Sequence, residues 1–444
     1  MSTQAVAEFI CRTRYEDMPA PVIEQAKRCT LDTLGAAIAG RKRKTVNILE
    51  RLVSDLGEGR PEAVIFGAGR KASAPNATLV NSLISTVLDT DDGSMSPVGH
   101  LGHIGGCVIP AALAVAEREG AAGKGFLEAV AAGYEVFLRT GWILTEPEQK
   151  KFSISGTPGT YAAAAAAAKL LRLPVAETVH ALGIAEPHAP VPRMGRIALT
   201  GPMTKEAMPW GSMTGVTAAL LAGRGFTGPR TLFDDPNPQN SCLEHLGRSY
   251  EILKIYFKPY CACRYTHAAL DIVLDRLRAG EFAPGDVSRI TVEAGAGAAL
   301  LSAVRPNTIE HAQYSFPFVL GAALAYGEVS PPQMEDARLA DERILNFAQK
   351  VKIGYSEEVN ALLPGRFAAA VTIETRDGRK LREMRAVPKG DPEDPMTDAD
   401  LEAKFRKWTE PVIGRERAGK IIQTVRGLEG LPHIEALTAL LASF

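Results

Sequence analysis

The sequence predicts a mainly α-helical protein with a smaller α+β second domain, and three observations support this fold class. A chain of 444 residues is too long for one ordinary hydrophobic core, so two domains are expected. Apolar residues recur at helical spacing as far as Tyr256, whereas alternating apolar and polar residues appear only beyond it. Helical spacing returns at Asp398. We therefore expect a large helical domain formed by both chain ends, 1–256 and 398–444, and an α+β domain over 257–397.

Six helices are expected in the first part of the chain. The third of them opens with Pro110 near its first turn, where proline is tolerated. These helices are rich in alanine and glycine where helices meet, and such small side chains let helix backbones approach closely. A tightly packed helical body is therefore expected from Ile23–Ala39, Ala77–Leu88, Val108–Glu119, Gly125–Leu138, Thr160–Leu171 and Met213–Gly223.

The second part of the chain combines strands with helices. Ser288–Gly295 alternates apolar and polar residues, as a half-buried strand does. Phe367–Thr375 and Lys380–Val387 flank an Asp-Gly turn and therefore predict a β-hairpin. Two helices and a proline- and acid-rich linker complete this part: Pro317–Tyr326, Asp341–Lys350 and Lys389–Pro395.

Composition excludes several classes of function. The formal net charge is −1 and the basic residues form no stripe, so nucleic-acid binding is not expected. Neither a signal pattern nor an apolar run of about 18 residues is present, so we expect a cytoplasmic protein with no membrane segment. The six cysteines are too sparse for a disulfide framework. The one close pair, Cys261 and Cys263, lacks the second pair that a zinc site needs.

An acidic segment followed by a glycine- and histidine-rich segment is the first candidate site. Asp89, Asp91 and Asp92 place three carboxylates in four positions at the end of an apolar helix, where mutual repulsion and the helix dipole make them costly. The loop that follows contains five glycines with His100 and His103, and then a helix begins. Such a loop suits anion binding and proton movement. A solvated turn and a divalent-metal loop are the alternatives.

Two further segments carry cations in unusual settings. Lys205 lies in an apolar, proline-rich loop, although a lone lysine is usually a surface charge. A second cluster lies at the expected domain boundary, where ligand clefts are common, and predicts carboxylate or phosphate binding. Its histidine could equally brace the following helix. The cluster consists of Lys258, Tyr260, Arg264, Tyr265 and His267.

A third segment interrupts an apolar helix with three prolines. These prolines stop the helix and free Glu186 and His188 from helical packing. The alternative is a buried loop with a hydrogen-bonded histidine.

Together these motifs resemble the MmgE/PrpD family. Five motifs match the family in order over nearly the whole chain. They are Asp-x-Asp-Asp-Gly with Gly-His-x-Gly, Thr204-Lys205, the 225–229 Gly-Phe-Thr-Gly-Pro run, the 258–267 cluster and the 312–315 Ala-Gln-Tyr-Ser run. The family contains 2-methylcitrate dehydratase, cis-aconitate decarboxylase and iminodisuccinate epimerase. The resemblance implies a helical domain with an α+β lid, a homodimer, and chemistry beside a carboxylate without metal or cofactor.

The resemblance places five residues on positions that line the family's cleft: Asp89, Asp92, His103, Lys205 and Lys258. His103 is preferred to His100 because its spacing to Pro110 matches the family. Two family positions depart, since Ser153 stands where a histidine is common and Phe318 where dehydratases have tyrosine. A Glu-x-His-Ala-Pro run occurs in a less characterised branch, so we hypothesise that His188 supplies the missing imidazole.

We expect a metal-free, dehydratase-type lyase that removes a proton next to a carboxylate of a small di- or tricarboxylate. His103 would move the proton, with Asp89 or Asp92 orienting it, while Lys205, Lys258 and Arg264 stabilise the developing charge. The other predicted substrate-binding residues are Tyr260, His267 and Glu186. The alternatives are a decarboxylase, an isomerase or epimerase of a substituted succinate, and a non-catalytic paralogue that binds carboxylates.

Overall fold

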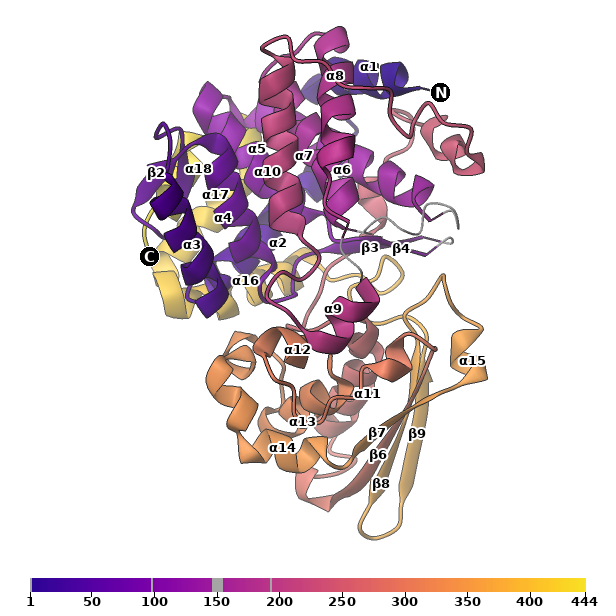
Figure 1. Cartoon of the computed structure of the whole chain (residues 1–444). Coiled ribbons are helices and arrows are strands. Elements are labelled where there is room, and N and C mark those ends of the chain that lie inside the picture. Colours follow the sequence, from indigo (N-terminus) through magenta and orange to yellow (C-terminus); the bar gives the residue numbers. More distant parts are fainter. Residues whose placement is uncertain (1, 97–98, 146–154, 192–193) are drawn as a thin grey trace.

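The computed structural model describes residues 2–96, 99–145, 155–191 and 194–444. Helices dominate these residues and the sheets are small, which confirms the mainly α fold class with an α+β part. Figure 1 shows the helices gathered above and the largest sheet below. Within the described ranges, no helix has the length and apolarity needed to cross a bilayer.

The helical body is built on close contacts between alanine- and glycine-rich helices. α7 lies at its centre and packs against α10, α6 and α5, and every described residue of α7 up to Ala168 is buried. A Cβ added at Gly215 of α10 would lie 2.3 Å from the Thr160 carbonyl oxygen of α7, so only glycine allows this approach. The helices of this part are α1 (Thr3–Arg12), α2 (Ala20–Gly40), α3 (Lys44–Leu56), α4 (Ala74–Thr86), α5 (Gly105–Glu119), α6 (Gly123–Ile143), α7 (Gly156–Leu170), α8 (Val175–Ala185), α9 (Met194–Thr200) and α10 (Met208–Ala222).

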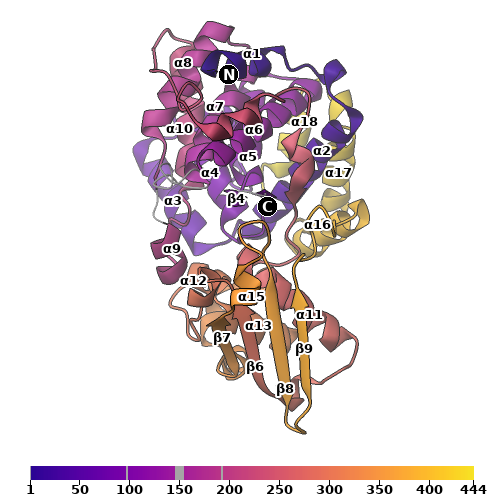
Figure 2. The same cartoon turned by 90° about the vertical axis from the view of Figure 1, so that its right-hand side faces the viewer.

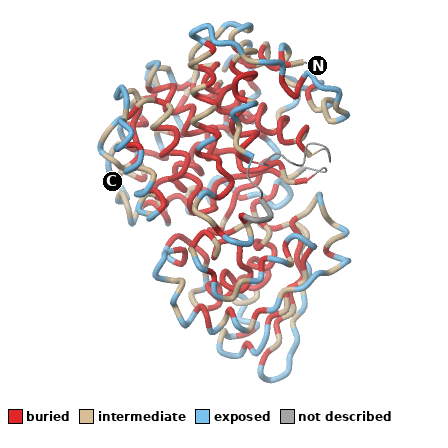
Figure 3. The backbone as a smooth tube through the Cα atoms, in the orientation of Figure 1, coloured by how far each residue is buried: buried red, intermediate tan, exposed pale blue. Residues whose placement is uncertain are grey.

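The C-terminal helices pack against the N-terminal ones. α16 (Asp398–Ile413) and α17 (Arg415–Arg426) contact α2, and α18 (Glu435–Thr438) contacts α5. Lys404 of α16 donates to Asp32 Oδ1 at 2.6 Å and to the Thr90 carbonyl at 3.1 Å. Figure 3 shows buried residues running through the middle of this helical body.

A four-stranded sheet forms the framework of the α+β part, with strand order β7-β6-β8-β9 (Figure 2). β6 (Val287–Ala294) pairs parallel to β7 (Val351–Tyr355) and antiparallel to β8 (Ala369–Thr375). β8 and β9 (Lys380–Arg385) form the predicted Asp-Gly hairpin. The helices beside the sheet are α11 (His267–Arg278), α12 (Ile309–Tyr314), α13 (Phe316–Tyr326), α14 (Glu342–Ala348) and α15 (Glu357–Asn360).

The glycine-rich segment that looked like a loop is a short hairpin. β3 (Gly93–Ser96) pairs with β4 (Gly99–Gly102) and with the distant β5 (Ile255–Tyr256). A Cβ at Gly93 would lie 2.3 Å from the Tyr256 hydroxyl, which explains a glycine at this crossing. The helix after the hairpin begins at Gly105, so Pro110 lies inside α5 and not at its start. A separate two-stranded sheet joins β1 (Ala63–Ile65) and β2 (Arg70–Ala72).

Candidate active site

A cavity of about 350 Å³ lies where the helical body meets the α+β part, and it contains the candidate acid–base residues. A larger hollow of about 600 Å³ surrounds Arg14 and Lys169, but the Lys169 ammonium there is occupied by the Cys11 and Thr13 carbonyls. We therefore place the candidate site in the smaller cavity. Its described lining residues are Asp89, His100, His103, Ala198, Glu206, Cys263, Arg264, Tyr265, Gly297, Leu301, Tyr314 and Phe367.

Asp89 is held between two lysines just beyond the end of α4. Its Oδ1 accepts a hydrogen bond from Lys258 Nζ at 2.6 Å, and its Oδ2 lies 3.8 Å from Lys205 Nζ. Burial acts to raise the pKa of Asp89, but the two ammonium charges hold that pKa well below its usual range. Burial likewise acts to lower the pKa of Lys258, yet Asp89 raises it. Both groups are therefore charged at neutral pH.

Lys205 also binds the C-terminal end of α4, which lies next to the carboxylates of the acidic segment. Its ammonium donates to the Thr86 carbonyl at 3.0 Å and to Gln313 Oε1 at 3.0 Å, while Gln313 Nε2 donates to the Val87 carbonyl. A cation at the C-terminus of a helix interacts favourably with the helix dipole. Positive φ angles at Lys205 (41°) and Ala207 (56°) turn this loop toward α4.

His103 and Glu206 form a pair in which burial shifts both pKa values toward the neutral form of the side chain. The Asp92 carbonyl can only accept, so His103 Nδ1 donates to it at 3.1 Å and leaves Nε2 as the acceptor. That Nε2 lies 3.8 Å from Glu206 Oε1 and 4.0 Å from Asp89 Oδ1. Burial lowers the pKa of His103 well below its usual value and raises the pKa of Glu206. Ser155 Oγ donates to Glu206 and fixes it.

Asp92 has a supporting position and does not line the cavity. It accepts hydrogen bonds from the Gly105 backbone N–H at 2.7 Å and from the Tyr134 hydroxyl at 2.6 Å. These bonds join the acidic segment to the first turn of α5. A Cβ at Gly105 would lie 2.3 Å from Thr33 Oγ1 and 3.1 Å from Asp92 Oδ1, so this contact requires glycine. Burial raises the pKa of Asp92 to about 6.

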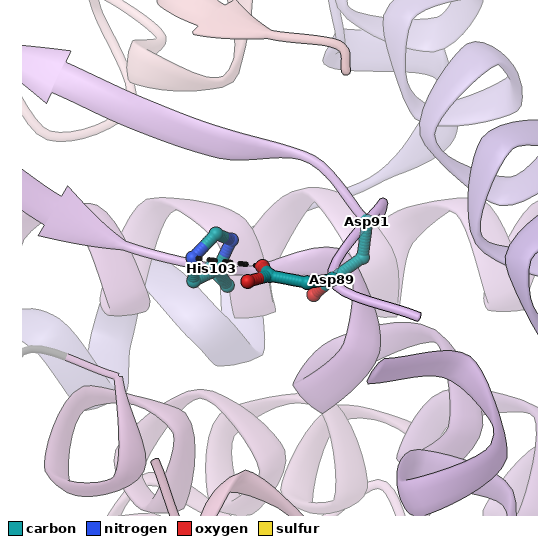
Figure 4. A group of neighbouring side chains, drawn as sticks. All are labelled: Asp89, Asp91 and His103. Atoms are coloured by element: carbon teal, nitrogen blue, oxygen red, sulfur yellow. Dashed lines mark ion pairs between the residues drawn. The ribbon is translucent and has the colours of Figure 1, made fainter. Parts of the chain in front are cut away.

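Asp91 is buried with neither of its carboxyl oxygens hydrogen-bonded among the described residues. Burial raises its pKa to about 8, so the protonated form predominates at neutral pH. Asp89, Asp91 and His103 offer ligand atoms within 4.8 Å of one another, and Figure 4 shows them around one point. These are the residues that could hold a divalent ion. Such an ion would have to displace Lys258 from Asp89 and deprotonate Asp91, and both steps oppose its binding.

Three residues of the 258–267 cluster play different structural roles. The Arg264 guanidinium lines the cavity and lies 4.4 Å from the Tyr256 ring centroid, while its N–H groups donate to Asp391 and to the Lys389 carbonyl. Tyr260 donates to Asp271 at 2.7 Å, and His267 donates to the Ala262 carbonyl at 3.0 Å. Tyr260 and His267 are outside the cavity lining and brace the start of α11.

Glu186 and His188 are not brought to the cavity. Glu186 accepts from the Tyr161 hydroxyl and from the Leu232 backbone N–H. His188 is exposed, and its Nδ1 donates to the Ile184 carbonyl at 2.8 Å, because the helical path continues through Glu186 as a short 3-10 turn. The described structure therefore gives no support to His188 as a replacement imidazole. Ser153, on which that hypothesis was based, lies outside the described residues.

Sequence reasoning missed three residues of the cavity. Glu206 follows Lys205 and resembled an ordinary surface charge, although its apolar, proline-rich loop was a signal of burial. His100, which was set aside in favour of His103, also lines the cavity and bonds the Tyr256 hydroxyl at 3.1 Å. Burial lowers the pKa of His100 to about 3, so it is neutral. Tyr314 lines the cavity, whereas Phe318 is a core residue of α13.

Comparison with known proteins gives matches along almost the whole chain. The MmgE/PrpD N-terminal domain matches residues 4–242, and the MmgE/PrpD C-terminal domain matches residues 260–429. A cis-aconitate decarboxylase-like protein, oryM, from Aspergillus oryzae is 26% identical over 99% of this chain and 97% of its own length. Human cis-aconitate decarboxylase is 25% identical over 99% of this chain and 94% of its own length. The Aspergillus terreus cis-aconitate decarboxylase is 24% identical over 99% of this chain and 95% of its own length.

Proposed function

The chain belongs to the MmgE/PrpD family, and on that premise we propose that it is a lyase acting next to a carboxylate of a small di- or tricarboxylate. The observation that carries the proposal is the buried pair of His103 and Glu206, which lies beside Lys205, Lys258 and Asp89 and in which burial favours the neutral form of each side chain. Removing a proton beside a carboxylate builds negative charge on an anionic group. A neutral base, a neutral acid and fixed cations are the groups that this chemistry needs.

Dehydration is the reaction that this pair serves most directly. His103 Nε2 takes the proton from the carbon next to the substrate carboxylate, and the ammonium groups of Lys205 and Lys258 stabilise the charge that develops. Glu206 then donates its proton to the departing hydroxyl, which leaves as water. Asp89 holds Lys258 by a hydrogen bond and lies 3.8 Å from Lys205 before the substrate enters.

Decarboxylation is the second candidate, and the comparisons favour it. The relatives named above are cis-aconitate decarboxylases or resemble them. In this reaction the C–CO₂⁻ bond breaks, its electron pair remains on carbon under the influence of the lysines, and Glu206 protonates that carbon. The same residues support either lyase reaction, so the products must decide between them.

The deciding experiment incubates the protein in deuterium oxide with a panel of di- and tricarboxylates and follows products by NMR. Water loss supports the dehydratase and carbon dioxide release the decarboxylase. Exchange of deuterium without bond breakage would identify an epimerase, and tight binding without exchange a carboxylate-binding protein, so either result would overturn the lyase proposal. His103→Asn and Glu206→Gln are each expected to lower kcat by at least about 100-fold. His188→Ala, at an exposed residue outside the cavity, is the control and should keep full turnover.

The proposed reaction uses the lysines in place of a divalent ion. Treatment with a chelator is therefore expected to leave kcat unchanged, because Lys258 and Lys205 already compensate Asp89. The measurement compares kcat before and after chelation and after adding back magnesium, manganese or zinc. Activity lost on chelation and restored by one of these ions would show that Asp89, Asp91 and His103 form a metal site.

A further inference from the structure

The candidate cavity has two chemically different walls. The wall from the acidic segment, the β-hairpin and the loop before α10 is polar and carries Asp89, His100, His103 and Glu206. The wall from the α+β part is largely apolar. Its large side chains are those of Tyr265, Leu301, Tyr314 and Phe367.

Positive charge is scarce at the surface of this cavity. Among the described lining residues, Arg264 is the only lysine or arginine, and its N–H groups already donate to Asp391 and to the carbonyls of Pro388 and Lys389. The lysines lie behind the surface. Lys258 has a fully buried side chain and donates to Asp89.

These charges nearly balance before a ligand enters. Lys258 is paired with Asp89 and Arg264 with Asp391, and Lys205 lies 3.8 Å from Asp89, so all three cations already have a carboxylate near them. Burying an anionic group without a partner is costly. Each carboxylate of a ligand beyond the first is therefore less well compensated, and a tricarboxylate is compensated worst.

The apolar wall offers contacts that an unsubstituted acid does not use. Leu301 and Phe367 present apolar carbon atoms to the cavity, so a hydrocarbon group of the ligand would pack against carbon and not against polar groups. The Tyr314 hydroxyl is buried and has no hydrogen-bond partner among the described residues. The hydroxyl can therefore form a hydrogen bond with a polar atom of the ligand, such as a second carboxylate or a hydroxyl.

We propose that the substrate is a dicarboxylate with an alkyl or aryl substituent, and that this cavity discriminates against tricarboxylates. The substituent lies on the wall of Leu301, Phe367 and Tyr265, while the carboxylates face Arg264 and the Tyr314 hydroxyl. This inference rests on the proposed function for the reacting carbon. It concerns affinity, however, and affinity is measured without turnover.

The test compares four unreactive acids by isothermal titration calorimetry: succinate, 2-butylsuccinate, 2-benzylsuccinate and tricarballylate. Each buried methylene is expected to tighten binding by about fourfold. The dissociation constant of 2-butylsuccinate should therefore be at least about 10-fold lower than that of succinate, and tricarballylate should bind no more tightly than succinate. Equal binding of all four acids, weak binding of all four, or tightest binding of tricarballylate would overturn the inference.

Variants of two adjacent leucines test whether the preference for 2-butylsuccinate over succinate comes from the apolar wall. Leu301→Ala is expected to reduce the preference for 2-butylsuccinate over succinate by about 10-fold. Leu301→Lys adds a cation there and should shift the preference toward tricarballylate. Leu300→Ala is the matched control, because Leu300 is 60% exposed and is absent from the lining. An unchanged preference in Leu301→Ala, or an equal loss in Leu300→Ala, would contradict the assignment.

The two proposals fail in different ways. If no acid is turned over but the predicted order of affinities is found, the lyase proposal fails and this inference stands. If tricarboxylates are turned over and also bind most tightly, the inference fails and the lyase proposal stands.

Discussion

Glu206 shows how burial changes the chemistry that a carboxyl group can perform. Its neighbours are His103 and Ser155, and burial raises its pKa, so it holds a proton to a higher pH than an exposed glutamate does. Its apolar, proline-rich loop was the one sign in the sequence that it is not a surface charge. The acidic segment was predicted as a site because its carboxylates are clustered, but the partner acid of His103 comes from a loop about 100 residues later, and only folding brings them together.

The pH dependence of kcat follows from these two pKa shifts. Glu206 acts as an acid only while protonated, so kcat is expected to fall as pH rises through its raised pKa. His103 has a lowered pKa and stays neutral, so no loss is expected as pH falls through about 6.5, the usual histidine value. Measurement of kcat against pH for the wild type and Glu206→Gln checks this. The variant should be slow and lack the alkaline decline.

Asp91 provides the control for that profile, because its pKa is raised to about 8 and its ionisation would also produce an alkaline decline. If the alkaline decline persists in Glu206→Gln and disappears in Asp91→Asn, the acid has been assigned to the wrong residue.

The ion pair of Lys258 and Asp89 is expected to matter for stability as well as for the site. Replacing Lys258 with methionine leaves Asp89 buried with only the more distant Lys205 beside it. Loss of one partner of a buried pair typically costs about 3–5 kcal/mol of unfolding free energy. Lys254→Met removes an exposed lysine from its pair with Glu251 and should cost less than about 1 kcal/mol. Urea denaturation of both variants tests this, and equal losses would contradict it.

At the scale of helices, packing in the body depends on glycines at helix crossings. A Cβ at Gly215 would lie 2.3 Å from the Thr160 carbonyl oxygen and 2.7 Å from the Ala163 Cβ, so Gly215→Ala must push α10 away from α7. Overpacking of this kind costs about 1–3 kcal/mol. Gly125 of α6 has open space around it, and Gly125→Ala should stabilise the protein by roughly 0.5–1 kcal/mol. Thermal denaturation measures both shifts, and a stable Gly215→Ala would show that the crossing is adaptable.

Elements with strong local patterns were predictable, and elements formed by distant partners were not. The β8–β9 hairpin was predicted because its residues alternate around an Asp-Gly turn, and the structure confirms it. β3 and β4 were missed because five of their eight residues are glycine or serine, which have little strand preference. Their third partner, β5, lies about 160 residues away. β7 was missed because its residues are mostly half-buried or exposed.

At the scale of the whole molecule, the two chain ends meet behind the candidate site. Lys404 of α16 compensates the buried Asp32 carboxylate of α2 and holds the Thr90 carbonyl inside the acidic segment. Lys404→Met is therefore expected to lower both the unfolding free energy, by about 3–5 kcal/mol, and kcat. Lys407→Met is the control, because Lys407 lies on the same helix but is exposed. A stability loss with unchanged kcat would show that α16 does not position the acidic segment.

The fold class was predictable at this scale because helical periodicity and strand alternation occupy different parts of the chain, and the structure confirms it. The arrangement of the cavity was not predictable. Arg264 lines the cavity although it is bonded to Asp391, whereas Tyr260 is bonded to Asp271 of α11 and lies outside the lining, and no motif indicates this difference.

The contact between Lys404 and Asp32 also sets an order of events during protein synthesis. The two residues are 372 positions apart, and ribosomes add about 5–20 residues per second. Asp32 therefore leaves the ribosome roughly 20–75 s before the lysine that neutralises it. Until α16 arrives, α2 carries an uncompensated carboxylate on a face that must be buried. The helices translated last thus complete the part of the protein translated first, and the Thr90 carbonyl of the acidic segment gains its hydrogen bond from Lys404 only when translation is almost finished.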